Sequence, residues 1–278
     1  MLIQRIITAL VLLAILLPAM FYPSPVPFMV VSLLLLAAGA WEWGVLNGYS
    51  RGAALLLIME CMVLCVLAWK LGLPWVQTPT LWLVVGGAWV LLGVFLVRAG
   101  VPAWPRLVLW LRIVGGVVLL SLAWLAVAQA RVRGINFLLS VLCLVWAADI
   151  FAYFAGKAFG RRKLAPAISP GKSWEGVWGG MVGVAVLAVG WIAFDRITGQ
   201  ATLSLYSVLF AKGWWLLLLG VIFLAAMSVV GDLLESLVKR SGGFKDSSNL
   251  LPGHGGVLDR VDALLPAVPL AMMLCSVA

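Results

Sequence analysis

The sequence predicts an all-α, polytopic membrane protein with about nine transmembrane helices. Of its 278 residues, 64% are hydrophobic and only 10% are charged. The mean hydropathy of +1.15 is far above that of soluble domains. Apolar runs of nearly 20 residues recur along the whole chain, and a run of that length crosses a bilayer as a helix.

Nine candidate spans follow one another along the chain. They cover residues 5–20, 26–46, 53–70, 80–98, 107–130, 135–155, 174–196, 214–238 and 257–277. The first lacks a small-residue cleavage site and leads directly into the second, so we expect a retained helix rather than a signal peptide. The longest polar stretches, 156–173 and 240–256, are too short to bury a core of their own. No soluble domain is expected.

The cysteines favour neither a metal centre nor a disulfide framework. Cys61, Cys65, Cys143 and Cys275 all lie in apolar segments, without a C-x-x-C pair and without a nearby histidine. Cysteine-ligated metal sites and disulfide frameworks have characteristic cysteine spacings that this chain lacks.

The basic residues predict the orientation in the membrane. With nine spans, most of the 19 Lys and Arg residues share a side with the N-terminus, which the positive-inside rule assigns to the cytoplasm. The excess comes from the residues from Lys157 onward, which are also candidates for a functional site. The orientation therefore depends equally on that site needing a cytoplasmic ligand.

Residues 1–134 are predicted to be scaffold helices that could also form a homodimer surface. Glu42 and Glu60 are their only acidic residues. Glu42 lies between two tryptophans near a helix end, where we expect its side chain to extend toward water. Glu60 lies nearer a helix centre and is a candidate partner for Arg112.

Residues 135–278 are predicted to be the catalytic region, because eight of the ten acidic residues lie between Asp149 and Asp262. Ionisable groups in membrane segments are costly and usually have a function. Asp149 and Tyr153 are four residues apart and so share a helix face. Gly156 and Gly160 extend this face and allow a backbone or a ligand to approach closely.

A basic loop then leads into the run ISPGKSWEG at residues 168–176. Its Gly-Lys-Ser triplet resembles the end of a P-loop, but Pro166 stands where the first glycine belongs and no strand is expected before it. A lysine and hydroxyls at a helix N-terminus still suit phosphate. The alternative is a topological anchor in which Ser173 caps the helix. The candidates in this run are Ser169, Lys172, Ser173 and Glu175.

The densest group of charges lies where the last two predicted helices meet. On the first of them, one helical stripe carries Asp232, Glu235, Ser236 and Lys239. The second opens with Asp259 and Asp262, three apart on one face. Converging carboxylates without histidine or thiolate favour Mg²⁺, and neighbouring cations favour a polyphosphate ligand. The alternative is a salt-bridge network that locks the two helices together.

The stretch 236–262 also fits a family signature. The fixed positions are Ser236, Lys239, Arg240, Lys245, Asp246, Pro252, His254, Gly255, Gly256, Asp259, Arg260 and Asp262. At this spacing they resemble the signature S-x-x-K-R-x4-K-D-x5-P-x-H-G-G-x-x-D-R-x-D of phosphatidate cytidylyltransferases, also called CDP-diacylglycerol synthases. The resemblance reaches upstream to Asp149 and covers about residues 145–265.

The resemblance implies a nucleotidyltransferase of phospholipid biosynthesis. It would convert CTP and phosphatidate to CDP-diacylglycerol and diphosphate, with Mg²⁺ alone or with a second cation. The enzyme would be integral to a bacterial-type inner (plasma) membrane, with its active site facing the cytoplasm. Its partners would be CTP, phosphatidate and membrane lipid. A net charge of +9 fits an anionic lipid surface better than nucleic acid.

The resemblance also implies roles for individual residues. Asp232 and Asp259 would hold the metal. Asp246 and Asp262 would be further ligands or would orient the lysines, and Lys239 would act with these acids in catalysis. Substrate binding would fall to Asp149, Tyr153, Ser169, Lys172, Ser173, Glu175, Ser236, Arg240, Lys245, His254 and Arg260.

Two other functions remain open. One is a CTP-dependent lipid kinase of the polyprenol type, which would release CDP; the complete signature argues against it. The other is an anionic-lipid transporter with the charged cluster as a midplane site. Against this, the cluster is concentrated at one face and the sequence shows no internal repeat.

Overall fold

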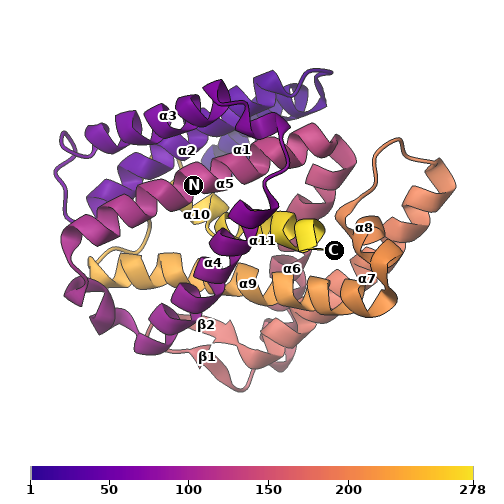
Figure 1. The fold of residues 1–278 in the computed structure, drawn as a ribbon. Coiled ribbons are helices and arrows are strands. Elements are labelled where there is room, and N and C mark those ends of the chain that lie inside the picture. The colour runs from indigo at the N-terminus through magenta and orange to yellow at the C-terminus, as the bar shows by residue number, and fades with distance from the viewer. Residues whose placement is uncertain (1, 278) are drawn as a thin grey trace.

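The protein is a bundle of helices interrupted by one small hairpin (Figure 1). The structure is a computed structural model that describes residues 2–277, so residues 1 and 278, at the outer ends of the two predicted regions, lie outside it. The helices of the first half are α1 (Leu2–Phe21), α2 (Val26–Leu46), α3 (Leu55–Lys70), η1 (Leu73–Trp75), α4 (Pro79–Ala99), η2 (Val101–Arg106) and α5 (Leu109–Arg133). The second half contains α6 (Ile135–Phe159), β1 (Lys163–Ala165), β2 (Ser169–Ser173), α7 (Trp174–Thr198), α8 (Leu205–Lys212), α9 (Trp214–Ser241), α10 (Leu258–Val261) and α11 (Leu264–Val277). The predicted all-α class is confirmed.

Within residues 2–277, seven helices are long and apolar enough to cross a membrane, namely α1, α2, α4, α5, α6, α7 and α9. The predicted spans 53–70 and 257–277 correspond to α3, with 16 residues, and to α10 with α11, the latter of 14 residues. At 1.5 Å per residue, α3 and α11 are about 24 and 21 Å long, shorter than the ~30 Å hydrocarbon core. The protein is thus a polytopic membrane protein, but the count of nine spans is not confirmed.

Helix α11 can be short because protein surrounds it. It lies in the middle of the bundle (Figure 1) and contacts α4, α5 and α9. Ala267, Val268, Leu270 and Ala271 are fully buried. The apolar run that predicted a span therefore forms part of the core, and its first turn is split off as α10.

Helices α6 and α7 pack with their backbones close together, because α7 presents glycines to α6. A methyl group at Gly180 would lie 2.8 Å from the carbonyl oxygen of Ala148, and one at Gly176 would lie 2.9 Å from that of Ala152. Small residues permit such close contact between membrane helices. The contact fixes α6, which carries Asp149, against the start of α7 and the hairpin.

We expect Gly180→Val to lower the melting temperature of the purified protein in detergent. The branched side chain would force α6 and α7 apart, and overpacking of this kind costs about 1–3 kcal/mol. Gly190→Val on the same helix is the control, because a methyl group there meets no atom within 4 Å. An unchanged melting temperature for Gly180→Val would show that the helices are not in tight contact.

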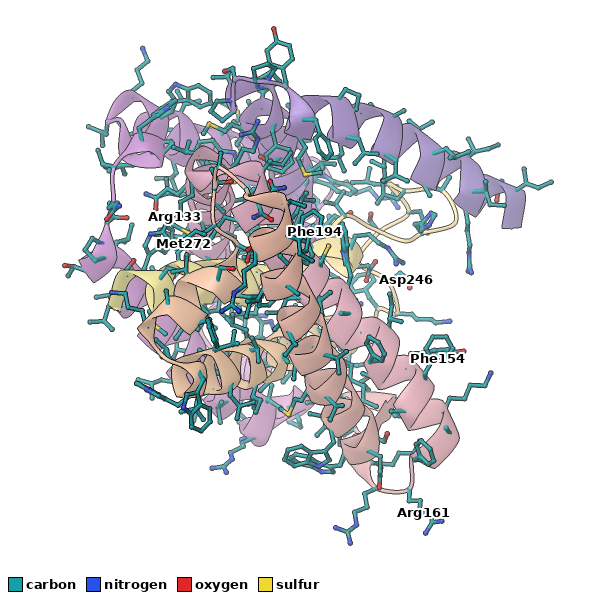
Figure 2. All side chains as sticks on the ribbon, turned by 90° about the vertical axis from the view of Figure 1, so that its right-hand side faces the viewer. Arg133, Phe154, Arg161, Phe194, Asp246 and Met272 are labelled. Atoms are coloured by element: carbon teal, nitrogen blue, oxygen red, sulfur yellow. The ribbon has the colours of Figure 1, made fainter. Side chains whose placement is uncertain are left out.

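The start of α1 and the signature loop lie on the same side of the molecule. Asp246 and Phe154 lie on one side of the molecule in Figure 2, and Arg133 and Met272 lie on the opposite side. The start of α1 belongs to the Asp246 side, because Arg5 Nε donates to the carbonyl of Gly253 at 2.8 Å. The N-terminus and the signature loop therefore share a side, as the sequence predicts.

Candidate active site

The acidic stripe of α9 faces the hairpin. Lys172 Nζ on β2 lies 2.5 Å from Asp232 Oδ2 on α9. The hydroxyl of Ser236 donates to the other oxygen of Asp232 at 3.3 Å. Asp149 on α6 is close enough to interact electrostatically with both Lys172 and Asp232. Three elements therefore bring four of the predicted residues together.

Lys239 lies between two carboxylates at the end of the same stripe. Its Nζ is 2.5 Å from Asp259 Oδ1, and it also forms an ion pair with Glu235, one helical turn earlier. Lys239 is 8% exposed and Glu235 is 5% exposed. Buried charges of this kind are tolerated only when they are paired, so each of the three depends on the others.

Asp259 accepts hydrogen bonds on both oxygens. Besides the ammonium of Lys239, it receives the backbone N–H and the hydroxyl of Ser247, each at 2.9 Å, and the N–H of Gly256 at 2.8 Å. Burial raises the pKa of the Asp259 carboxyl, but the hydrogen bonds from Lys239, Gly256 and Ser247 outweigh it and hold the pKa at about 2. Asp259 is therefore an anion that also organises the loop around it.

Asp262 is in a different situation. Burial, and after it the charge of nearby Asp232, raise the pKa of Asp262 to about 8. One of its oxygens accepts the N–H of Ala263 at 2.8 Å. Asp232 and Asp262 are thus close carboxyl groups that would repel one another if both were ionised, and a cation between them would relieve that repulsion.

The predicted metal ligands differ in how well they fit a divalent cation. Asp232 keeps 30% of its side chain exposed; its Oδ2 is paired with Lys172, but Oδ1 accepts only the long hydrogen bond from Ser236, so that oxygen fits a metal. Asp259 has no free oxygen unless it gives up Lys239. Across residues 2–277, no three His, Cys, Asp or Glu side chains form a ready metal cluster. A metal held by Asp232 and Asp259 therefore stays a prediction.

The run 168–176 forms part of a hairpin that the sequence did not predict. Strand β2 pairs antiparallel with β1, with Ser169 opposite Ala165. Ser173 Oγ accepts the N–H of Gly176 at 3.2 Å, which is the cap of α7 that the topological-anchor alternative expects. In this run, it is Lys172 that reaches the acids.

Glu175 holds the shape of the same segment. Its carboxylate accepts the backbone N–H groups of Arg161 and Arg162 at 3.1 to 3.2 Å. These bonds tie the end of α6 to the start of α7. In the described contacts, Glu175 therefore positions the hairpin.

The remaining predicted residues lie around this cluster. Arg240 donates to the carbonyl of Phe244 at 3.2 Å, and Arg260 donates twice to the carbonyl of His254, at 3.0 and 2.6 Å. The Nδ1 atom of His254 is buried without a hydrogen-bond partner among the described residues. Five of the predicted residues have exposed side chains: Tyr153, Arg240, Lys245, Asp246 and Arg260. The three cations among them, Arg240, Lys245 and Arg260, are open to an anionic ligand.

Two expectations about the first half were wrong. Glu42 does not extend toward water: it is 0% exposed, and its carboxylate accepts four hydrogen bonds from residues 247–258. Glu60 does not pair with Arg112, which instead lies 3.4 Å from Asn47 Oδ1 in the described chain. An acidic residue in an apolar helix is costly, and this indicated that Glu42 has a partner or a function. The sequence could not identify the partners, because they are more than 200 residues away.

The whole chain is similar to known cytidylyltransferases. The model of the cytidylyltransferase family matches residues 3–278. A phosphatidate cytidylyltransferase of Pseudomonas aeruginosa is 41% identical over 97% of this chain and 95% of its own length. The protein of that name from Haemophilus influenzae is 37% identical over 97% and 96%, and one from Brucella melitensis is 35% identical over 83% and 70%. The chain therefore belongs to the cytidylyltransferase family.

Proposed function

We propose that the protein is a phosphatidate cytidylyltransferase, which converts CTP and phosphatidate to CDP-diacylglycerol and diphosphate. The observation that carries this proposal is the convergence of Lys172, Asp232, Lys239 and Asp259 from the hairpin, α9 and α10. Relatives with that name align over nearly the whole chain, so they span this cluster. A lipid kinase or a transporter has no comparable support.

The chemistry needs charge stabilisation more than a covalent catalyst. A phosphate oxygen of phosphatidate attacks the α-phosphorus of CTP, the bond from that phosphorus to the β-phosphate oxygen breaks, and diphosphate leaves. The exposed cations Arg240, Lys245 and Arg260 would bind the phosphate oxygens. Lys172, held by Asp232 at the edge of the cluster, would orient the phosphate groups.

A Mg²⁺ ion would be held by Asp232 and Asp259, with Asp262 beside them. When bound, it would neutralise the charge of the phosphate groups. Asp259 would join only by exchanging Lys239, and the freed ammonium could then bind a phosphate oxygen. Asp262 has one oxygen outside its hydrogen bond to Ala263 and needs no such exchange.

We place the site on the cytoplasmic side, because CTP is a water-soluble polyanion and the loops around the site are basic. Phosphatidate would keep its acyl chains in the bilayer and enter from the side. Residues 1–134 would be the scaffold and residues 135–278 the catalytic region, although Glu42 shows that the scaffold also contacts the site. A homodimer through the first-half helices stays a prediction.

Purified protein in detergent, supplied with phosphatidate, Mg²⁺ and CTP labelled at the α-phosphate, tests the proposal. We expect label in the lipid and release of diphosphate. With CTP labelled at the γ-phosphate, label in the lipid and release of CDP would instead identify a kinase. No turnover of CTP under any metal condition would reject both enzymes and favour transport.

A further inference from the structure

We propose that Glu42, on α2, is a positioning residue for the cytidylyl-transfer site, an inference that deepens the proposed function and rests on it. The carboxylate of Glu42 holds the loop 247–258 and so fixes the turn α10 that carries Asp259. Glu42 lies outside the signature and in the half of the chain that the sequence marks as scaffold.

The carboxylate is fully used in this contact. Glu42 Oε1 accepts the hydroxyl of Ser248 at 2.6 Å and the N–H of Val257 at 2.8 Å. Oε2 accepts the N–H of Leu258 at 2.7 Å and the hydroxyl of Ser247 at 3.1 Å. The ion pairs of the described chain do not include Glu42. Its charge is therefore balanced by three hydrogen-bond donors and by the Ser247 hydroxyl that it shares with Asp259, and such bonds are stronger to an anion than to a neutral group.

Two of these donors belong to the start of α10. The N–H groups of Val257 and Leu258 are among those that a helix leaves without internal partners. A carboxylate supplied by another helix satisfies them and also suits the positive end of the turn. Glu42 thereby determines the direction in which α10 leaves the loop.

The loop is folded between Glu42 and Asp259. Ser247 Oγ lies 3.1 Å from Glu42 Oε2 and 2.9 Å from Asp259 Oδ2, and its single proton can serve only one of them at a time. Gly256 donates its N–H to Asp259, and a methyl group on its Cα would collide with Glu42 Oε1. Moving Glu42 would therefore move Asp259, and with it the ammonium of Lys239.

The test compares Glu42→Gln with Asp195→Asn. Glu42→Gln replaces one carboxylate oxygen by an NH₂ group, which cannot accept hydrogen bonds. The donors that face that position therefore lose their acceptor, while the shape of the side chain stays the same. Asp195 is the matched control, because it is 6% exposed and accepts hydrogen bonds from Asn136, Ser204 and Ser207. It lies about 33 Å along α7 from Ser173, counting 1.5 Å per residue. Both changes remove one buried carboxylate.

We expect Glu42→Gln to lower kcat at least tenfold with KM for CTP changed less than threefold, because two of the three exposed cations proposed to bind CTP, Arg240 and Lys245, lie outside the segment that Glu42 holds. Asp195→Asn should keep the kcat of the folded protein even if its melting temperature falls. Equal kcat for the two variants at matched folded fraction would overturn the proposal. So would a larger loss of kcat for Asp195→Asn.

Hydrogen exchange gives a readout that does not depend on activity. Backbone amides of residues 247–258 should exchange faster in Glu42→Gln than in the wild type or in Asp195→Asn. Faster exchange in a protein whose wild type shows no cytidylyl transfer would reject the proposed function and leave the anchoring role of Glu42 standing. Unchanged exchange would reject the anchoring role itself.

Discussion

Asp232→Asn is expected to lose at least about a hundredfold of its turnover while the protein stays folded, by analogy with the roughly 10²- to 10³-fold loss when one preorganised oxyanion-hole donor is removed. The substitution keeps the shape of the side chain but removes its charge. That charge lies 2.5 Å from the ammonium of Lys172 and acts on nearby Asp262. Because 30% of the side chain is exposed, water can solvate the amide, and we expect only a small change in stability.

Steady-state kinetics over a Mg²⁺ titration checks this result. Glu60→Gln is the control, because it removes an acid from the exposed face of α3, away from the cluster. Near wild-type turnover by Asp232→Asn at every Mg²⁺ concentration would show that Asp232 is not a metal ligand. Lys172→Met and the double variant complete a cycle, in which non-additive losses would show that the two residues act as a unit.

The fold was largely predictable, because its helices follow from the length and hydrophobicity of each segment. The hairpin was not. Strands β1 and β2 have three and five residues, too few for an alternating pattern, and Pro170 and Gly171 argue against a strand on local grounds. Ser173 only caps α7 locally, whereas Glu175 ties the end of α6 to the start of α7 through the N–H groups of Arg161 and Arg162, which is a tertiary effect.

The sequence predicted which residues belong to the site better than it predicted which of them form ion pairs with one another. Helical spacing alone places Asp232, Ser236 and Lys239 on one stripe. It cannot say that Lys172 pairs with Asp232 while Lys239 pairs with Asp259, because these choices depend on how the hairpin and α10 approach α9. Glu42 escaped prediction for the same reason, since a lone acid between tryptophans has the same local sequence whether it faces water or a distant loop.

Lys239→Met is expected to abolish turnover and also to destabilise the protein. It would leave Glu235 and Asp259 without their cation, and breaking a buried ion pair by removing one partner costs about 3–5 kcal/mol. The loss of stabilisation should differ between the two carboxylates. Asp259 keeps its bonds from Ser247 and Gly256, whereas neither oxygen of Glu235 has a hydrogen-bond partner in the described chain and Lys239 is its ion-pair partner.

This asymmetry makes Glu235→Gln the compensating change for Lys239→Met. In the double variant the unpaired buried charge at position 235 is gone, so the melting temperature in detergent should recover most of what Lys239→Met loses. Turnover should stay lost, because an ammonium that binds phosphate oxygens is still absent. Recovery of turnover together with stability would mean that Lys239 only locks α9 to α10, as the salt-bridge alternative predicts. Persistent loss of turnover in a fully stable double variant would place Lys239 among the groups that contact the reacting phosphates.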